Sequence, residues 1–167
     1  MSLPLPYRNV SFCNDDEQKQ IAQEFEMHKG SNLCLETSSV GYALEVDLSF
    51  PSELANYFST YPPVATKRKI DPSEYSPHTS ALVQDQNLKK CTTAKLLTDL
   101  YPKKNFHLHA INLKQLLQIG VSLDKVHRVV RFDQKPWLSE YINFNNSKRK
   151  ISSSKFEKDY YKLCNNR

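Results

Sequence analysis

The segment from Tyr42 to Leu48, YALEVDL, alternates strictly between large apolar side chains and small or acidic ones. Successive side chains of a strand point to opposite faces of a sheet, so this pattern predicts a strand with one buried face and one polar face. Residues 104–110 and 126–132 are predicted strands as well. Segments whose apolar residues recur at helical spacing precede and follow these strands, and the combination predicts an α+β fold.

Two helices have clear sequence signals. Asn14 followed by Glu17 forms a capping box for a helix that extends to His28. After the strand at 104–110, leucines at helical spacing predict a second helix with Asn112 as its N-cap. Between these parts, residues 66–93 are polar and lack periodicity, which predicts a long loop.

The chain therefore divides into four predicted segments. Residues 1–65 form an N-terminal palm-like segment, and residues 66–97 form a polar loop. Residues 98–135 form a strand–helix–strand unit, and residues 136–167 form a basic helical end.

Charge rises steadily along the chain. Residues 1–66 hold three Lys and Arg against nine Asp and Glu, whereas residues 125–167 hold eleven against four. A basic end indicates a polyanionic partner, and the alternative is that these lysines merely solvate helix and loop surfaces. The four cysteines are scattered without a C-x-x-C pair, which is typical of reduced thiols in an intracellular protein. The sequence contains no apolar run long enough to predict a membrane span, so no membrane partner is expected.

The last helix is predicted from Ser154, an N-cap with Glu157 at the capping-box position. One side then carries the residues predicted to pack on the rest of the protein, Phe156, Tyr160, Leu163 and Cys164. The opposite side carries Lys155, Lys158 and Lys162, with Asn166 one turn further on.

The segment FEKDYYKLCNN resembles the fingers helix of family-B DNA polymerases of the protein-primed viral, organellar and Maverick/Polinton transposon type. Their motif Lys-x-x-x-Asn-Ser-x-Tyr/Phe-Gly matches at Lys162 and Asn166, whereas Arg167 stands in place of the serine. Three further stretches are similar to the transposon-type members in the same order: MSLPLPY, GYALEVDLSFPSEL and HRVVRFDQKPWLSEYINFNNSKRK. The resemblance implies an incomplete polymerase palm that leads into the fingers.

The resemblance also implies site residues. Lys162 would bind the triphosphate of the incoming deoxynucleoside triphosphate, and Asn166 would shape the pocket beside it. A second basic contact would come from a predicted loop, in which Arg149 and Lys150 are the first choices. Contacts to template-primer DNA are assigned to Lys148, Lys155 and Lys158, although a solvated helix face is the favoured interpretation of the last two.

Family members use Mg²⁺ and, in the protein-primed type, a terminal protein as primer. The resemblance implies that their two metal-binding aspartates lie before Met1 and after Arg167, so we expect this chain to be inactive alone and to hold no metal. A nuclear location would follow for a eukaryotic transposon copy. Two alternatives remain: a domesticated, non-enzymatic module that binds DNA or a protein, and a small α+β interaction domain with accidental similarity.

Three local patterns have plainer interpretations. Asp47 begins DLSFP, a shortened version of a family metal-binding motif, but an exposed acid at a strand end is the preferred interpretation. His107 and His109 share a strand face without a third ligand, as surface histidines do. Helical spacing of aromatic and aliphatic side chains from Trp137 to Ile142 indicates core packing rather than base stacking.

Overall fold

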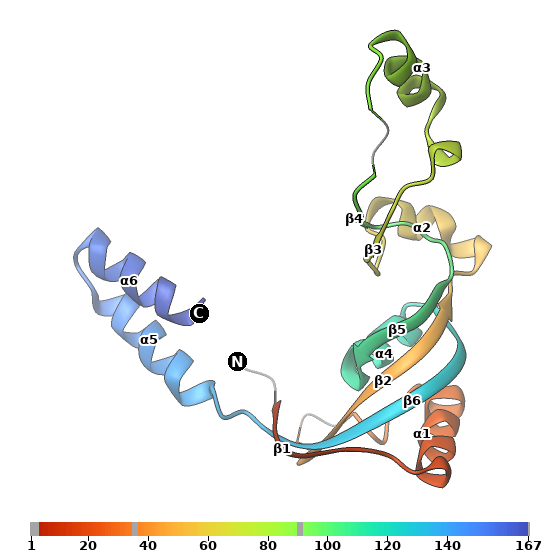
Figure 1. Cartoon of the computed structure of the whole chain (residues 1–167). Helices are drawn as coiled ribbons and strands as arrows, with labels where there is room; N and C mark the ends of the chain where they lie inside the picture. Colours follow the sequence, from red (N-terminus) through yellow and green to blue (C-terminus); the bar gives the residue numbers. More distant parts are fainter. Residues whose placement is uncertain (1–3, 35–36, 90–91, 167) are drawn as a thin grey trace.

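The computed structural model describes residues 4–34, 37–89 and 92–166. Its centre is a curled antiparallel sheet with the strand order β1-β6-β2-β5 (Figure 1). These strands are β1 (Leu5–Phe12), β2 (Val40–Ser49), β5 (Lys103–His109) and β6 (Ser122–Lys135). The predicted α+β class is confirmed, and each of the three predicted strands is present, the last one extended at both ends.

One face of the sheet is covered by α1 (Asp15–His28) and α4 (Ala110–Gln118). Leu44 on β2 lies opposite Val129 on β6, and both are buried against Phe25 of α1 and Leu113 of α4. Burial of such side chains stabilises a fold by about 1.5–3 kcal/mol each. This two-layer packing supplies the hydrophobic core.

Helix α1 begins and ends as its sequence predicts. Asn14 Oδ1 accepts the Glu17 N–H at 2.9 Å, and Glu17 Oε2 accepts the Asn14 N–H at 3.1 Å. At the other end Lys29 and Gly30 both have positive φ, at 51° and 70°, and their N–H groups bond back to carbonyls of the last turn.

Helix α4 begins earlier than its sequence predicts. The N-cap is His109, whose Nδ1 accepts the Ile111 N–H at 3.1 Å, and Asn112 lies inside the helix. The prediction was wrong because the cap is the last residue of β5, where the sequence pattern indicates only a strand.

The segment predicted to be a loop contains regular structure. An arm, residues 66–97, projects from the sheet (Figure 1). It starts and ends in a two-stranded ribbon and carries a helix with no buried residue, in the order β3 (Thr66–Arg68), η2 (Pro72–Glu74), α3 (Pro77–Asp85) and β4 (Lys95–Leu97). The arm is joined to β2 by η1 (Ser52–Leu54) and α2 (Ala55–Thr60). Helix α3 packs on no core, and its sequence has no amphipathic pattern. The periodicity of apolar residues therefore did not reveal it.

At the other end of the molecule, β6 leads into a helical hairpin of α5 (Ser139–Ile151) and α6 (Lys155–Asn165), set apart from the sheet (Figure 1). Trp137 and Tyr141 are exposed, so the core-packing interpretation of this segment was wrong for both aromatics. Lys148, Arg149 and Lys150 form the last turn of α5 rather than a loop. Cations are favourable there because the C-terminal end of a helix carries partial negative charge.

In the described part of the chain, no helix is both long and apolar enough to cross a membrane.

Candidate anion-binding hairpin

Three asparagines hold α5 and α6 together. Asn145 is buried, and its side-chain amide donates to Asn165 Oδ1 at 3.0 Å. The Asn165 amide in turn donates to Asn146 Oδ1 at 2.9 Å. Near the open end of the hairpin, the Tyr141 hydroxyl donates to the Cys164 carbonyl oxygen at 3.3 Å. These polar contacts therefore help to fix the relative position of the two helices.

Helix α6 starts at its predicted N-cap. The Ser154 hydroxyl accepts the Glu157 N–H at 3.1 Å, which is half of the predicted capping box. The apolar side of this helix does not pack as expected, because Phe156, Tyr160 and Leu163 are 79%, 54% and 58% exposed.

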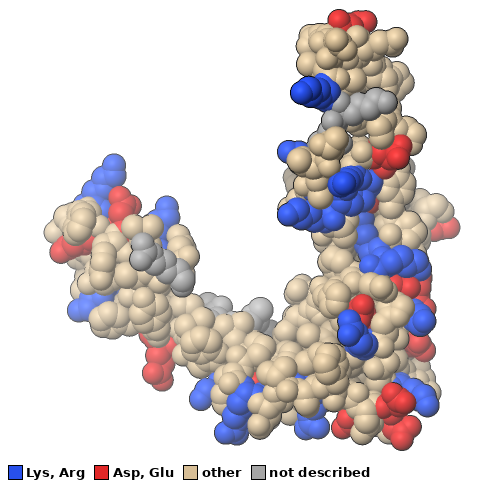
Figure 2. Space-filling model, viewed as in Figure 1, with Lys and Arg blue, Asp and Glu red and all other residues tan. Residues whose placement is uncertain are grey.

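Residues of both hairpin helices line an open hollow of about 590 Å³. Its lining combines cations, side-chain amides and one hydroxyl: Asn143, Asn146, Ser147, Arg149, Lys150 and Lys158. No acidic residue belongs to this lining, and Figure 2 shows basic side chains on the hairpin. The arrangement is suited to an anion with several oxygens.

The three cations of the hollow have no internal partner. Within the described residues, Arg149, Lys150 and Lys158 form no ion pair. A guanidinium binds phosphate in a bidentate manner, and an ammonium acts as a mobile point charge beside it. The amides of Asn143 and Asn146 can donate further hydrogen bonds to phosphate oxygens.

The structure gathers only some of the predicted site residues. Lys162 lies one turn after Lys158 on α6 and is exposed, outside the lining of the hollow. Asn166 is the C-cap of α6, where its N–H donates to the Leu163 carbonyl. Lys155 also lies outside the lining, and Lys148 extends over the Phe144 ring at 5.5 Å. Arg167, the mismatched motif position, lies outside the described residues.

The sequence patterns did not identify the side-chain amides and the hydroxyl that line the hollow. Asn143, Asn146 and Ser147 precede the basic run by only a few residues, but Asn has no preference that would mark it as a ligand. The Asn145–Asn165 contact joins positions twenty residues apart, and only the antiparallel packing of the two helices brings them together.

Asp47 does not belong to this hairpin, and its environment differs from the prediction. It lies on the face of the sheet that α1 and α4 do not cover, yet it is only 7% exposed, so the interpretation as an exposed acid was wrong. Its carboxylate accepts the Asn105 N–H and the His127 Nε2 at 2.9 Å each, and Lys104 Nζ at 3.2 Å. The hydrogen bonds from Asn105 and His127 lower the pKa of Asp47 to about 2.

These contacts bear on metal binding. Both oxygens of Asp47 already accept hydrogen bonds, and Lys104 brings a positive charge beside them. His107 is exposed near Glu45 at 3.8 Å, whereas His109 is half-buried as the cap of α4. In the described ranges no group of three or more His, Cys, Asp and Glu lies close enough to hold a metal ion. We therefore assign no metal ligand among these residues.

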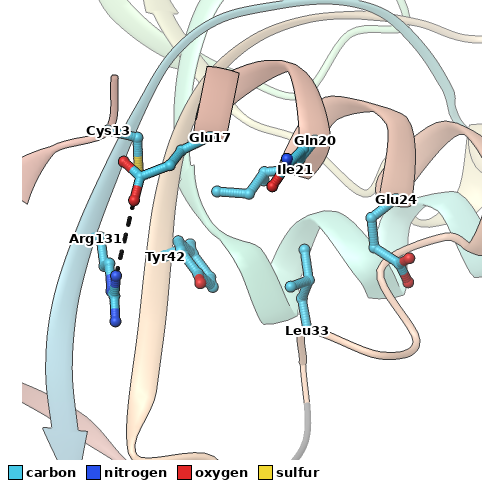
Figure 3. Close-up of a pocket in the computed structure, with 8 residues that line it drawn as sticks. All are labelled: Cys13, Glu17, Gln20, Ile21, Glu24, Leu33, Tyr42 and Arg131. Atoms are coloured by element: carbon cyan, nitrogen blue, oxygen red, sulfur yellow. Dashed lines mark ion pairs between the residues drawn. The ribbon is translucent and has the colours of Figure 1, made fainter. Parts of the chain in front are cut away.

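A second hollow, of about 310 Å³, lies between α1 and the sheet (Figure 3). Glu17 and Arg131 face each other across it at 3.9 Å, and Cys13 and Tyr42 lie beside them. Burial raises the pKa of the Cys13 thiol, so this thiol resists ionisation and is a poor nucleophile. Cys13, Cys34 and Cys164 are free thiols, as predicted, while Cys91 lies outside the described residues.

Comparison of the chain with protein-family models, with curated proteins and with solved structures gives no match. The assignment of function therefore rests on the geometry of the hairpin and on the sequence resemblance.

Proposed function

We propose that this chain supplies part of the nucleotide- and DNA-binding surface of a protein-primed family-B DNA polymerase. The α5–α6 hairpin acts as the start of the fingers, and the sheet acts as an incomplete palm. Deoxynucleoside triphosphate and template-primer DNA are the ligands, with a terminal protein as a further partner of the whole enzyme. The chain contributes binding and not the chemical step, which in this family needs metal-bound carboxylates.

One observation carries this proposal. Arg149, Lys150 and Lys158 come from two helices and converge on one hollow without any acid in its lining. Two of these three residues are the first choices for the second basic contact to triphosphate. Lys162 lies one turn after Lys158 on the same side of α6. An elongated polyphosphate that extends beyond the hollow would therefore reach it.

A non-enzymatic binding module is the second candidate. The exposed apolar side of α6, with Phe156 79% exposed, favours a protein partner for the hairpin. A protein-binding module needs no affinity for triphosphate, so nucleotide binding separates the two candidates.

The DNA part of the proposal is tested by titrating labelled primer-template duplex with the full chain at several salt concentrations. Counterion release makes phosphate binding weaken steeply with salt, with a slope of about −0.9 per contacted phosphate. We expect Lys148→Ala/Arg149→Ala/Lys150→Ala to bind more weakly and with a shallower slope. Lys19→Ala/Lys29→Asn removes exposed charge from α1 as the control, and asparagine tolerates the positive φ of residue 29.

A triple variant that binds duplex like the parent at every salt concentration would contradict the assignment of DNA contacts to the hairpin. Equal weakening by the α1 control would reduce the effect to net charge and would contradict it as well.

A further inference from the structure

The base of the arm carries a second basic surface, remote in sequence from the hairpin. Figure 2 shows Lys and Arg side chains gathered where β3, β4 and the start of β5 lie. The exposed lysines of the ribbon and its flank are Lys67, Lys69 and Lys95. None of them forms an ion pair within the described residues, so their charges remain available to a ligand.

Two acids of this region, Asp99 and Glu74, are already paired with cations. Asp99 accepts hydrogen bonds from Arg68 Nε at 3.0 Å and from Lys103 Nζ at 2.5 Å. Glu74 holds the other side of the Arg68 guanidinium with two bonds, at 2.6 and 2.8 Å. Two carboxylates thus compensate two internal cations, and the three outer lysines are left without compensation.

The same network holds an aromatic ring in place. Asp99 also accepts the Tyr101 N–H at 3.2 Å, and the Arg68 guanidinium lies over the Tyr101 ring at 5.2 Å from its centre. Tyr101 is nevertheless 57% exposed. Because Arg68 is held by both carboxylates, the guanidinium that lies over the ring is oriented before any ligand arrives.

An exposed aromatic ring beside an oriented arginine and among unpaired lysines is the combination that binds single-stranded nucleic acid. The lysines contact successive phosphates, and an unpaired base stacks on the ring, with a further contribution from an arginine. A duplex hides its bases within the stack and cannot use the ring in this way. A purely electrostatic surface would need no such ring.

We propose that the base of the arm binds single-stranded nucleic acid, with Tyr101 stacking on a base and Lys67, Lys69 and Lys95 contacting the phosphates. Arg68 and Asp99 act as positioning residues for the ring. This site is independent of the hairpin, and it does not require that the chain belong to a polymerase.

The test measures fluorescence anisotropy of labelled oligothymidylate, oligouridylate and a duplex of the same length with the full chain. Tyr101→Ala removes the ring, and Tyr101→Phe keeps it. We expect the alanine variant to lose about five- to hundredfold in affinity for the single strands, and the phenylalanine variant to bind like the parent. Similar losses for both oligonucleotides indicate recognition of the bases and phosphates without selection of the sugar.

The charge contribution is measured separately. Lys67→Ala/Lys69→Ala/Lys95→Ala should reduce the salt slope for single strands by about 2, at about 0.7 per phosphate. The α1 double variant Lys19→Ala/Lys29→Asn serves as the control and should keep the parent slope. Circular dichroism checks that each variant is folded, and the lysine triple variant keeps the inference testable if the Ala variant is not.

Two results would overturn this inference: unchanged single-strand affinity in Tyr101→Ala, or an equal loss of duplex affinity in that variant. Failure here leaves the hairpin proposal standing, because the hairpin variants change different residues and are tested with duplex DNA.

Discussion

The buried Asn145 side chain donates to Asn165 across the α5–α6 hairpin at 3.0 Å. This contact connects the two helices, and Asn165 also contacts Asn146 in the hollow. The shape of the candidate anion-binding hollow therefore depends on a side-chain hydrogen bond.

Asn145→Ala should loosen α6 without weakening the sheet. The substitution leaves Asn165 Oδ1 without its donor, which costs about 1–3 kcal/mol. Hydrogen exchange of α6 amides should accelerate accordingly, while β2 amides keep the parent rate. The matched control is Asn143→Ala, because within the described residues the Asn143 side chain bonds only to Ser139 on its own helix. Equal exchange rates in α6 for parent and Asn145→Ala would contradict the role of this contact.

Asp47 should make the sheet sensitive to acid. Its pKa falls from the ordinary 3.8 to about 2 through bonds from Asn105, His127 and Lys104. A lowered folded pKa means that the unfolded state binds more protons, so this stabilisation is complete above about pH 4 and is lost as the pH falls towards 2.

Urea unfolding at a series of pH values checks this expectation. Asp47→Asn should lower stability at neutral pH and show a smaller further loss between about pH 4 and 2 than the parent. Asp85→Asn, an exposed acid on α3, should behave like the parent. Parallel acid losses for parent and Asp47→Asn would contradict the assignment.

The exposed apolar side of α6 should make the isolated chain associate. Phe156, Tyr160 and Leu163 present a contiguous apolar stripe to solvent, because residues four and three apart lie on one side of a helix. Phe156→Glu should shift sedimentation velocity profiles towards monomer, and Ser153→Glu adds the same charge outside the stripe as the control. A parent that sediments as a clean monomer at all concentrations would contradict this prediction.

The hairpin and the arm should also unfold separately from the sheet. The core residues are concentrated around β2, β6, α1 and α4, and neither α3 nor α6 contains a buried residue. We expect a broad thermal transition with different midpoints for far-ultraviolet circular dichroism and for Trp137 fluorescence. One coincident, sharp transition would indicate a single cooperative unit instead.

Sequence patterns predicted the parts of the fold that local chemistry determines. The capping box of α1 and the alternation of β2 are complete within a few residues each, so they were found. Helix α3 and the helical conformation of Lys148–Lys150 were missed, because neither has an apolar face that packs on a core.

Long-range polar contacts explain the remaining differences. The burial of Asp47 depends on Asn105 and His127, which lie about sixty and eighty positions away in the chain. Its exposure could not be deduced from its own neighbours in sequence. For the candidate site, the cations were named from the resemblance, while their convergence with Asn143 and Asn146 required the packing of the hairpin.

The purified chain should not extend a primer. Lys162 and the hollow are proposed to bind a triphosphate, but the described residues contain no group of three or more His, Cys, Asp and Glu that could hold a metal ion to activate a primer hydroxyl. Primer extension with Mg²⁺ or Mn²⁺ and all four nucleotides should stay at background. Extension that disappears in Asp47→Ala would instead make this chain an enzyme and Asp47 a metal ligand.

Binding of a deoxynucleoside triphosphate by the full chain, measured by isothermal titration calorimetry, is the most direct test of the hairpin's role. Hydrogen bonds to charged groups contribute about 1.5–3 kcal/mol each, so Arg149→Ala/Lys150→Ala/Lys158→Ala should lower affinity at least about tenfold. Lys162→Ala, which removes the lysine that the resemblance assigns to the triphosphate, should also lower it, whereas Lys155→Ala, at the first residue of the same helix, should bind like the parent. A triple variant that binds triphosphate as tightly as the parent would contradict the account.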